Sequence, residues 1–267
     1  MDQLGAAIDE LEPAVVIYNY HVSTLGWVRE YFSIRSSVSP KHVAIHHEPH
    51  QPLPTWMDAA ISQNPIEPET ATQFSVGRIL HPFNQDVPKN DIPVIGTFGF
   101  GMAGKGFDRL VTKVCEEFDV ARIRMHIPFA HFGDASGVQA KAWATRAAEA
   151  LTKPDVMLEV NHYWLSTEEL LSFLAGNDLN AFLYDNMDRG IASVLDFALS
   201  VPRPLVITSS LMFQHVWSQV PEVLIETNSL RDILDRGTAP LAPLYAQWSP
   251  EQLCKDYERV IDALWQD

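Results

Sequence analysis

The hydrophobic and polar positions of the 267-residue chain follow two alternating patterns. Short runs rich in β-branched and aromatic residues predict strands, and longer segments with apolar residues three and four apart predict helices. The expected strands are Ala14–Tyr18, His42–His46, Pro93–Phe98, Arg122–Ile127, Val156–Val160, Ala181–Tyr184, Leu205–Thr208 and Val223–Glu226. The expected helices are Leu25–Ser33, Lys105–Phe118, Ala140–Leu151, Thr167–Ala175, Ile191–Leu199, Leu230–Asp235 and Pro250–Trp265. This alternation predicts an α/β fold with mainly parallel sheets.

Residues 51–91 separate two groups of these elements and differ from both in character. They are rich in proline and polar residues, which predicts an irregular excursion or linker. The chain after them holds about six expected strands, enough for a complete doubly wound domain at 91–267. Residues 1–90 hold two expected strands, too few for a domain of their own, so they predict a partial N-terminal domain. The final helix is expected to cross back to that part.

Composition and charge exclude several classes of partner. The chain carries 19 basic and 34 acidic residues, a net charge of −15, and no basic cluster. Nucleic acids and anionic membrane surfaces both require Lys/Arg patches, so neither is expected as a partner. The two cysteines, Cys115 and Cys254, are far apart and predict free, buried thiols in a reducing compartment. With no signal peptide and no long apolar stretch in this sequence, we expect a cytoplasmic protein.

A glycine-rich turn, from Gly99 to Gly106, follows one expected strand and opens a helix. Such a turn presents backbone N–H groups to an anion, and Lys105 adds a positive charge there. The turn nearly fits the dinucleotide fingerprint, but the next strand lacks the acidic residue that binds ribose. It nearly fits a P-loop, but Gly106 stands where a Ser or Thr must hold magnesium. A tight turn with an exposed lysine remains the simplest alternative.

The residues around Lys105 resemble a known family. The stretch from Pro93 through Lys105-Gly106-Phe107-Asp108 to Leu110 is similar to the start of the C-terminal domain in glycosyltransferase family 4. The resemblance implies that Lys105, supported by Gly104, contacts the phosphates of a sugar-nucleotide donor. The family usually carries an arginine where this chain has Phe100, so one of its two phosphate-binding cations is absent.

A second stretch, Asp188 to Thr208, resembles the family's pattern of acid, seven residues, acid, then a proline that opens a strand. Asp188 and Asp196 occupy the two acidic positions, which are usually glutamates. The resemblance implies that Asp188 holds hydroxyls of the transferred sugar and that Asp196 holds the ribose. The small residues Gly190, Ala192 and Ser193 would let the diphosphate approach the start of the helix, where Gly190 and Ile191 would bind it. The alternatives are a helix N-cap for Asp188 and a solvated surface position for Asp196.

Two further segments match the family in part. Tyr163 or Trp164 precedes the Glu168-Glu169 helix and occupies the turn that holds the nucleobase in the family, although each is equally a plain surface or core aromatic. His47, at the end of the second strand, fits the position of a histidine that faces the donor sugar. His47 and His50 lack the spacing of a metal pair on a helix or strand, so no metal site is expected.

Together these observations predict a GT-B-like fold with a complete doubly wound C-terminal domain and a reduced α/β N-terminal domain. The function that the resemblance implies is retaining transfer of a hexose from a nucleotide-diphosphate sugar to a glycan or small-molecule acceptor, with no metal or other cofactor. A non-catalytic sugar-nucleotide-binding subunit is the alternative, and a second subunit would then complete the N-terminal domain. An NAD-dependent oxidoreductase is a third interpretation, weakened by the missing ribose-binding acid.

Overall fold

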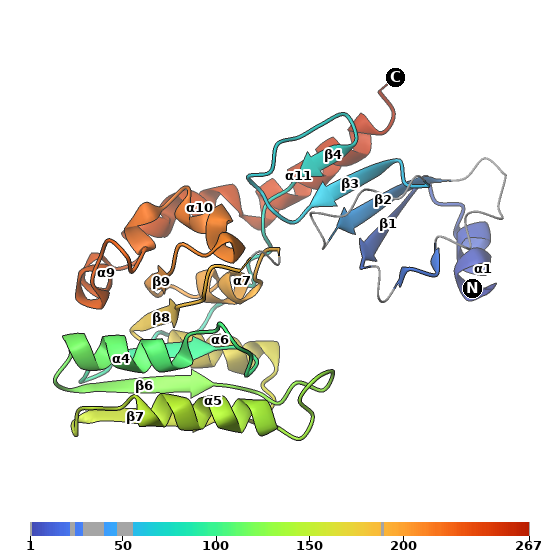
Figure 1. The fold of residues 1–267 in the computed structure, drawn as a ribbon. Coiled ribbons are helices and arrows are strands. Elements are labelled where there is room, and N and C mark those ends of the chain that lie inside the picture. The colour runs from blue at the N-terminus through green and yellow to red at the C-terminus, as the bar shows by residue number, and fades with distance from the viewer. Residues whose placement is uncertain (1, 22–24, 29–39, 47–55, 188–189, 267) are drawn as a thin grey trace. The chain divides into compact units, whose positions relative to one another are not determined.

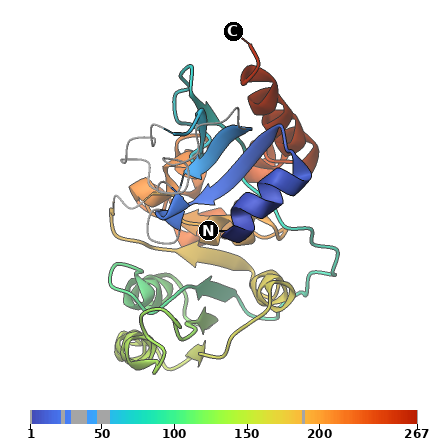
Figure 2. The ribbon, with the colours of Figure 1, turned by 90° about the vertical axis from the view of Figure 1, so that its right-hand side faces the viewer.

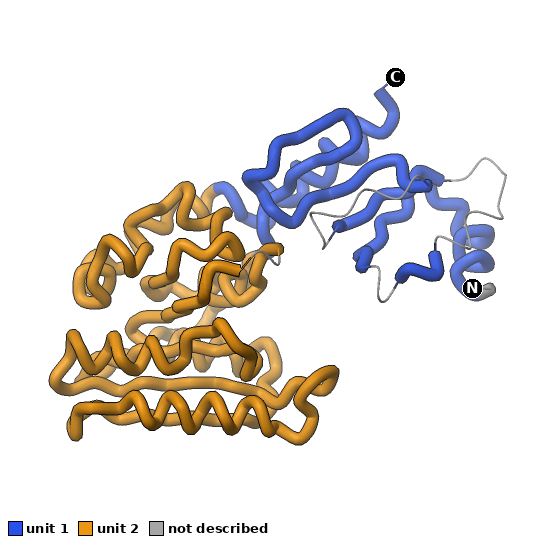
Figure 3. Tube along the Cα trace, in the orientation of Figure 1, with its two compact units in different colours: residues 1–79, 247–267 blue, residues 80–246 orange. Residues whose placement is uncertain are grey.

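The structure is a computed structural model and describes residues 2–21, 25–28, 40–46, 56–187 and 190–266 (Figure 1). Its chain divides into two compact units (Figure 3), residues 1–79 with 247–267 and residues 80–246. The expected boundary at 90/91 therefore differs from the observed one. Residues near 88–90 hydrogen-bond within the larger unit, where Asn90 donates to the Gly176 carbonyl at 3.1 Å and Arg203 donates to the Pro88 carbonyl.

The smaller unit contains a parallel four-stranded sheet of order β1-β2-β3-β4. Its elements are α1 (Asp2–Leu11), β1 (Val15–Tyr20), β2 (Lys41–His46), β3 (Ala59–Ser62), β4 (Gln73–Ser75) and α11 (Pro250–Ala263). Strands β3 and β4 lie inside the segment expected to be irregular, and α1 was not expected either. Of the expected helix Leu25–Ser33, residues 29–33 lie outside the described part of the chain.

The C-terminal helix α11 belongs to this smaller unit, in agreement with its expected crossing. Val260 is buried in one hydrophobic cluster with Val43, Ile61 and Phe74 of the sheet. At the exposed surface, Arg259 makes two hydrogen bonds to the carboxylate of Glu69 at 3.0 and 2.9 Å. Burial of apolar surface therefore contributes most of the free energy that holds α11 on the sheet, because an exposed ion pair contributes little.

The larger unit is a doubly wound domain with a parallel sheet of order β7-β6-β5-β8-β9. Its strands are β5 (Val94–Phe98), β6 (Ala121–His126), β7 (Val156–Asn161), β8 (Leu179–Phe182) and β9 (Leu205–Ile207). Its helices are α4 (Phe107–Glu117), α5 (Val138–Glu149), α6 (Thr167–Ala175), α7 (Val194–Leu199), α8 (Gln214–Trp217), α9 (Leu230–Arg236) and α10 (Ala242–Gln247). The expected strand Val223–Glu226 is wrong. Pro221 opens a short 3-10 turn there, and only Leu224 bridges to Ile207.

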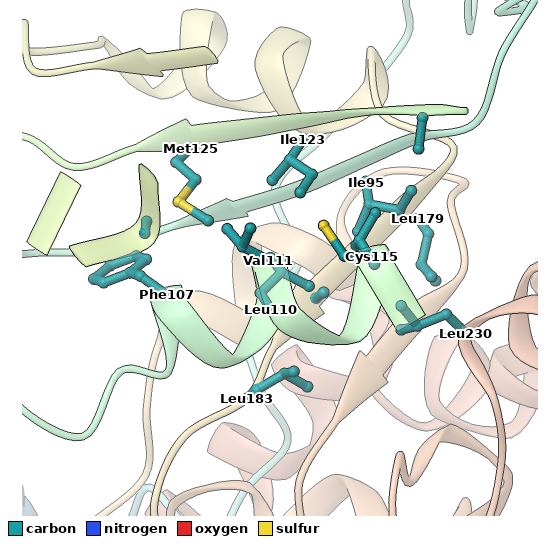
Figure 4. Packing of buried hydrophobic residues seen from close by; sticks show 14 of the residues in the cluster. Ile95, Phe107, Leu110, Val111, Cys115, Ile123, Met125, Leu179, Leu183 and Leu230 are labelled. Atoms are coloured by element: carbon teal, nitrogen blue, oxygen red, sulfur yellow. The ribbon is translucent and has the colours of Figure 1, made fainter. Parts of the chain in front are cut away.

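Both faces of this sheet are covered. Helices α4 and α5 lie on one face and α6 on the other (Figure 2). Every residue of β5, β8 and β9 is buried, as expected for parallel strands between two helical layers. The buried positions of α4 recur at helical spacing and pack against Ile95, Ile123 and Met125 (Figure 4).

Both cysteines are free, but Cys254 is exposed, so the expectation of two buried thiols is wrong for it; α11 turns this position to solvent. None of the described helices is both long and apolar enough to cross a membrane.

Candidate functional site

A pocket of about 590 Å³ lies at the carboxyl ends of the strands in the larger unit. Strand β5 is the first of the domain, and the chain continues from it to β6 and β7 on one side and later to β8 and β9 on the other. The point where the order reverses is where open α/β sheets bind ligands. The described lining residues are Phe98, Gly99, Phe100, Lys105, His126, Pro128, Trp164, Leu165, Ser166, Thr167, Leu170, Ile191, Ala192, Ser193, Val194, Phe197 and Met212.

The glycine-rich turn after β5 forms one wall, and glycine is required there by close packing. Gly104 and Gly106 have φ angles of 80° and 69°, in the left-handed region that L-residues rarely adopt. A Cβ on Gly106 would collide with the carbonyl oxygen of Leu183, and a Cβ on Gly101 would lie 2.5 Å from the Cα of Ala140. The turn is therefore pressed against the residues that follow β8 and against the start of α5.

Lys105 is positioned by the segment Leu183–Asp185, which we call the lysine seat. The Lys105 ammonium lies 3.9 Å from the centre of the Tyr184 ring. The backbone N–H of Asp185 donates to the Gly104 carbonyl at 2.8 Å. Arg109, on α4, pairs with the Asp185 carboxylate at 2.6 Å and donates to the Leu183 carbonyl. The Lys105 ammonium thus lies against the Tyr184 ring at the pocket wall, and the backbone just before it is fixed by the Asp185 N–H.

The lysine seat is also fixed from its other side. The hydroxyl of Thr208, directly after β9, donates to the Tyr184 carbonyl at 2.6 Å. The hydroxyl of Ser210 donates to the Asp185 carbonyl at 2.8 Å. The ends of β5, β8 and β9 are therefore joined into one hydrogen-bonded unit, which limits the freedom of Lys105.

Tyr184 is almost completely buried beneath Lys105. Its hydroxyl has no hydrogen-bond partner among the described residues, and a Cβ on Gly99 would lie 3.5 Å from it. Burial raises the pKa of Tyr184 far above its ordinary value. The ring is therefore neutral, and its face attracts the Lys105 cation without neutralising it.

His126 ends β6 and lines the same pocket. Its Nδ1 donates to the Oδ1 of Asn161 on the neighbouring strand β7, which assigns the proton to Nδ1. Burial lowers the pKa of His126, against an opposing effect of that hydrogen bond, so the imidazole is neutral at physiological pH. Lys105 is the one charged side chain among the described lining residues of the pocket.

Aromatic rings and hydroxyls form another part of the described wall. Phe100 comes from the glycine-rich turn, and Trp164 from the segment between β7 and α6. Ser166 caps α6 by accepting from the backbone N–H of Glu169 at 3.2 Å, and Thr167 begins the helix. Tyr163 and Trp164 are both 63% exposed, but only Trp164 is among the pocket residues. Of the two aromatics that the sequence singled out, the structure brings Trp164 to the site.

The second predicted motif is only partly described. Ile191 lines the pocket, and Gly190 just before it has a φ of 79°. Helix α7 begins at Val194, later than expected, and the N–H of Ala192 before it donates to the Met212 carbonyl at 3.1 Å. Asp196 is 7% exposed on α7, not a solvated side chain, and it is not among the pocket residues. The predicted catalytic residues Asp188 and His47 lie outside the described residues.

Sequence comparisons do not identify the chain. No protein-family model matches it, and no curated protein does. Solved structures do match. A glycosyltransferase from Rickettsia africae aligns with a TM-score of 0.67 at 10% identity, covering 100% of this chain and 81% of the other. Anabaena HepE, solved with UDP and glucose, aligns with a TM-score of 0.65 at 12% identity, covering 98% and 81%.

A third structure is larger. S. aureus TarM, in complex with fondaparinux, α-GlcNAc-glycerol and UDP, aligns with a TM-score of 0.62 at 12% identity. The match covers 96% of this chain and 58% of TarM, so the chain spans little more than half of that protein. The chain has a GT-B-like fold. At these identities the similarity shows the fold alone.

Proposed function

We propose that this chain transfers a hexose from a nucleotide-diphosphate sugar to a glycan or small-molecule acceptor, with retention at the anomeric carbon and without a metal ion. The observation that carries the proposal is the position of Lys105 in the pocket at the carboxyl ends of the strands. Two of the structures that share the fold, HepE and TarM, contain UDP. A UDP-like diphosphate combines the negative charge that Lys105 attracts with a base that the aromatic side chains suit.

The proposed chemistry is mainly electrostatic. When the bond between the sugar and the diphosphate breaks, negative charge grows on the leaving phosphate oxygens. Lys105 stabilises that charge, and it needs no reorganisation at that moment because the lysine seat already holds it. The backbone of Gly104 and the residues Gly190 and Ile191 would line the diphosphate. Since α7 has only six residues and begins at Val194, we assign less of the neutralisation to its dipole than to Lys105.

The remaining roles follow the family resemblance. Asp188 would hold hydroxyls of the transferred sugar, His47 would line its other face, and Asp196 would bind the ribose. The free cysteines suit a reducing compartment, and we place the activity in the cytoplasm.

The substitution Lys105→Ala tests the phosphate site. Loss of a charge-assisted contact costs about 1.5–3 kcal/mol, so the affinity for a nucleoside diphosphate should fall about 10- to 150-fold. Calorimetry measures the affinity, and transfer of a labelled sugar measures turnover. Lys113→Ala is the matched control, because Lys113 lies on α4 in the same unit and pairs with Glu116 at 2.7 Å. Unchanged donor affinity and turnover in Lys105→Ala would refute the assignment.

The second candidate is a non-catalytic sugar-nucleotide-binding subunit, with a partner completing its acceptor side. Phe100 favours it, because an aromatic side chain lines the pocket where the resembling family carries a phosphate-binding cation. Donor binding with neither hydrolysis nor transfer over a broad panel of acceptors would support this candidate over the enzyme.

A further inference from the structure

The larger unit holds a second cavity, with a volume of about 420 Å³. Helix α6 contributes residues including Glu168, Glu169 and Phe173 to its lining, and β6 contributes Arg124. Of the described lining residues, only Leu165 also lines the first pocket. Small-molecule sites typically have volumes of about 300–1,000 Å³. The second cavity is therefore distinct from the proposed donor site and large enough for a small ligand.

The guanidinium of Arg124 is held in place by the C-terminal end of α6. Its Nη1 donates to the Phe173 carbonyl at 3.2 Å and to the Oδ1 of Asn177 at 3.0 Å. The guanidinium carbon also lies 4.5 Å from the centre of the Phe173 ring. A Cβ on Gly176 would lie 2.7 Å from Nη1, so glycine leaves the room that this group needs. One edge of the guanidinium is thus fixed before any ligand arrives.

The other edge of the same guanidinium is unused. Within the described part of the chain, Nε and Nη2 of Arg124 make no hydrogen bond, and no carboxylate pairs with this half-buried side chain. Glu159, its partner in register on β7, pairs instead with Arg122 at 3.3 Å. Nε and Nη2 together form a flat fork of donors that matches the two oxygens of a carboxylate. A preorganised fork of this kind, left without an acidic partner in a cavity, is suited to a carboxylate ligand.

The cavity also carries a carboxylate of its own. Glu168 is exposed on α6, and its carboxylate has no hydrogen bond or ion pair to the residues that the structure describes. The carboxylate of Glu169 is already used, because it accepts from the backbone in the capping box of α6. Tyr163 and Phe173 add aromatic surface to the lining. A multiply charged anion such as phosphate would be repelled by Glu168, whereas a zwitterion complements both charges.

We propose that this second cavity binds an α-amino acid with an apolar side chain. Nε and Nη2 of Arg124 donate to its carboxylate, and Glu168 accepts from its ammonium. Its side chain lies along the rings of Tyr163 and Phe173. The proposal is independent of the proposed sugar transfer, because Arg124 and Glu168 are not among the residues of the first pocket.

Calorimetric titration of the full chain with L-phenylalanine tests the site. L-Phenylalanine should bind saturably, and more tightly than hydrocinnamate, which lacks the ammonium, or phenethylamine, which lacks the carboxylate. Arg124→Lys keeps the charge but loses the flat fork, so it should weaken L-phenylalanine at least about tenfold. Glu168→Gln should weaken L-phenylalanine about two- to fivefold and leave hydrocinnamate unchanged, because only the amino acid carries a group for Glu168 to bind.

Arg146→Lys is the matched control. Arg146 lies on α5 in the same unit, and its guanidinium carbon is likewise close to an aromatic ring, 4.7 Å from the centre of Trp143. This variant should bind L-phenylalanine like the wild type. Because Glu168 is exposed, Glu168→Gln should unfold at the wild-type temperature, which a thermal scan checks. It therefore tests the site even if Arg124→Lys loosens the end of α6.

Four results would overturn the proposal. The first is that the wild type does not bind L-phenylalanine, and the second is that hydrocinnamate binds as tightly as the amino acid. The third is displacement of bound L-phenylalanine by an equal concentration of inorganic phosphate, which would make the cavity a plain anion site. The fourth is loss of binding in Lys105→Ala but not in Arg124→Lys, which would place the amino acid in the first pocket.

Discussion

Replacement of Gly106 by alanine should destabilise the folded protein, although alanine is itself a small residue. Gly106 has a φ of 69°, and a Cβ there would collide with the carbonyl oxygen of Leu183. That oxygen accepts a hydrogen bond from Arg109, so it cannot move without disturbing the lysine seat. The substitution therefore forces either the turn or the end of β8 to shift.

The cost has two parts. A left-handed backbone costs a residue with a Cβ about 1–2 kcal/mol. Displacing the Leu183 carbonyl weakens its bond to Arg109, which we discount to about 1 kcal/mol because the Arg109 side chain is 46% exposed. The total is about 2–3 kcal/mol. For a domain of about 150–250 residues, a loss of this size lowers the unfolding midpoint by roughly 4–12 °C.

Differential scanning calorimetry measures the midpoint, and Gly133→Ala supplies the control. Gly133 lies on an exposed turn of the same unit, and a Cβ there would meet nothing within 4 Å. Its replacement should change the free energy of unfolding by less than about 0.5 kcal/mol. If the unfolding midpoint of Gly106→Ala equals that of Gly133→Ala, the turn does not pack against Leu183, and the support of Lys105 by the lysine seat is refuted.

Two other changes test the buried polar groups of the site. Tyr184→Phe removes a hydroxyl that has no hydrogen-bond partner among the described residues, and it keeps the ring beneath Lys105. Urea unfolding should therefore show an unchanged free energy of unfolding or a gain of up to about 1 kcal/mol. A clear loss would reveal a hydrogen bond to this hydroxyl. Because burial lowers the pKa of folded His126, its contribution to stability should be complete above the ordinary histidine pKa of about 6.5 and decline as the pH falls below it. His126→Gln should therefore flatten the stability profile between about pH 5 and 7, and an unchanged profile would contradict the shift.

Local signals predicted some elements well. The helix Thr167–Ala175 has the bounds expected for it, because Ser166 and Glu169 form a capping box that marks its start. The spacing of Phe107, Leu110, Val111 and Val114 likewise predicted α4 as a helix with one buried face. By contrast, β3 has the sequence Ala-Ala-Ile-Ser, which carries little strand preference and forms because its four residues are buried between neighbours.

The site was predictable only in part. The glycine-rich turn predicted Lys105 at a junction of strand and helix, and the structure has it there, at the wall of the pocket. The seat beneath Lys105 was not predictable, because Tyr184 approaches it only after β5 and β8 pair in the sheet. The proximity of Phe100 and Trp164, whose ring centres are 6.5 Å apart, was not predictable for the same reason. Phe100 was noted only as a missing cation.

The lysine seat is held largely through main-chain atoms. The Gly104 carbonyl, the Asp185 N–H and the carbonyls of Leu183 and Tyr184 all take part, and these groups are common to every amino acid. Natural variation can therefore change other side chains around Lys105 without moving its ammonium, provided that the turn glycines, the Tyr184 ring and the donors Arg109 and Thr208 persist. A comparison of sequences by side-chain identity would therefore detect little of this arrangement, whereas a comparison of backbone structures would detect it.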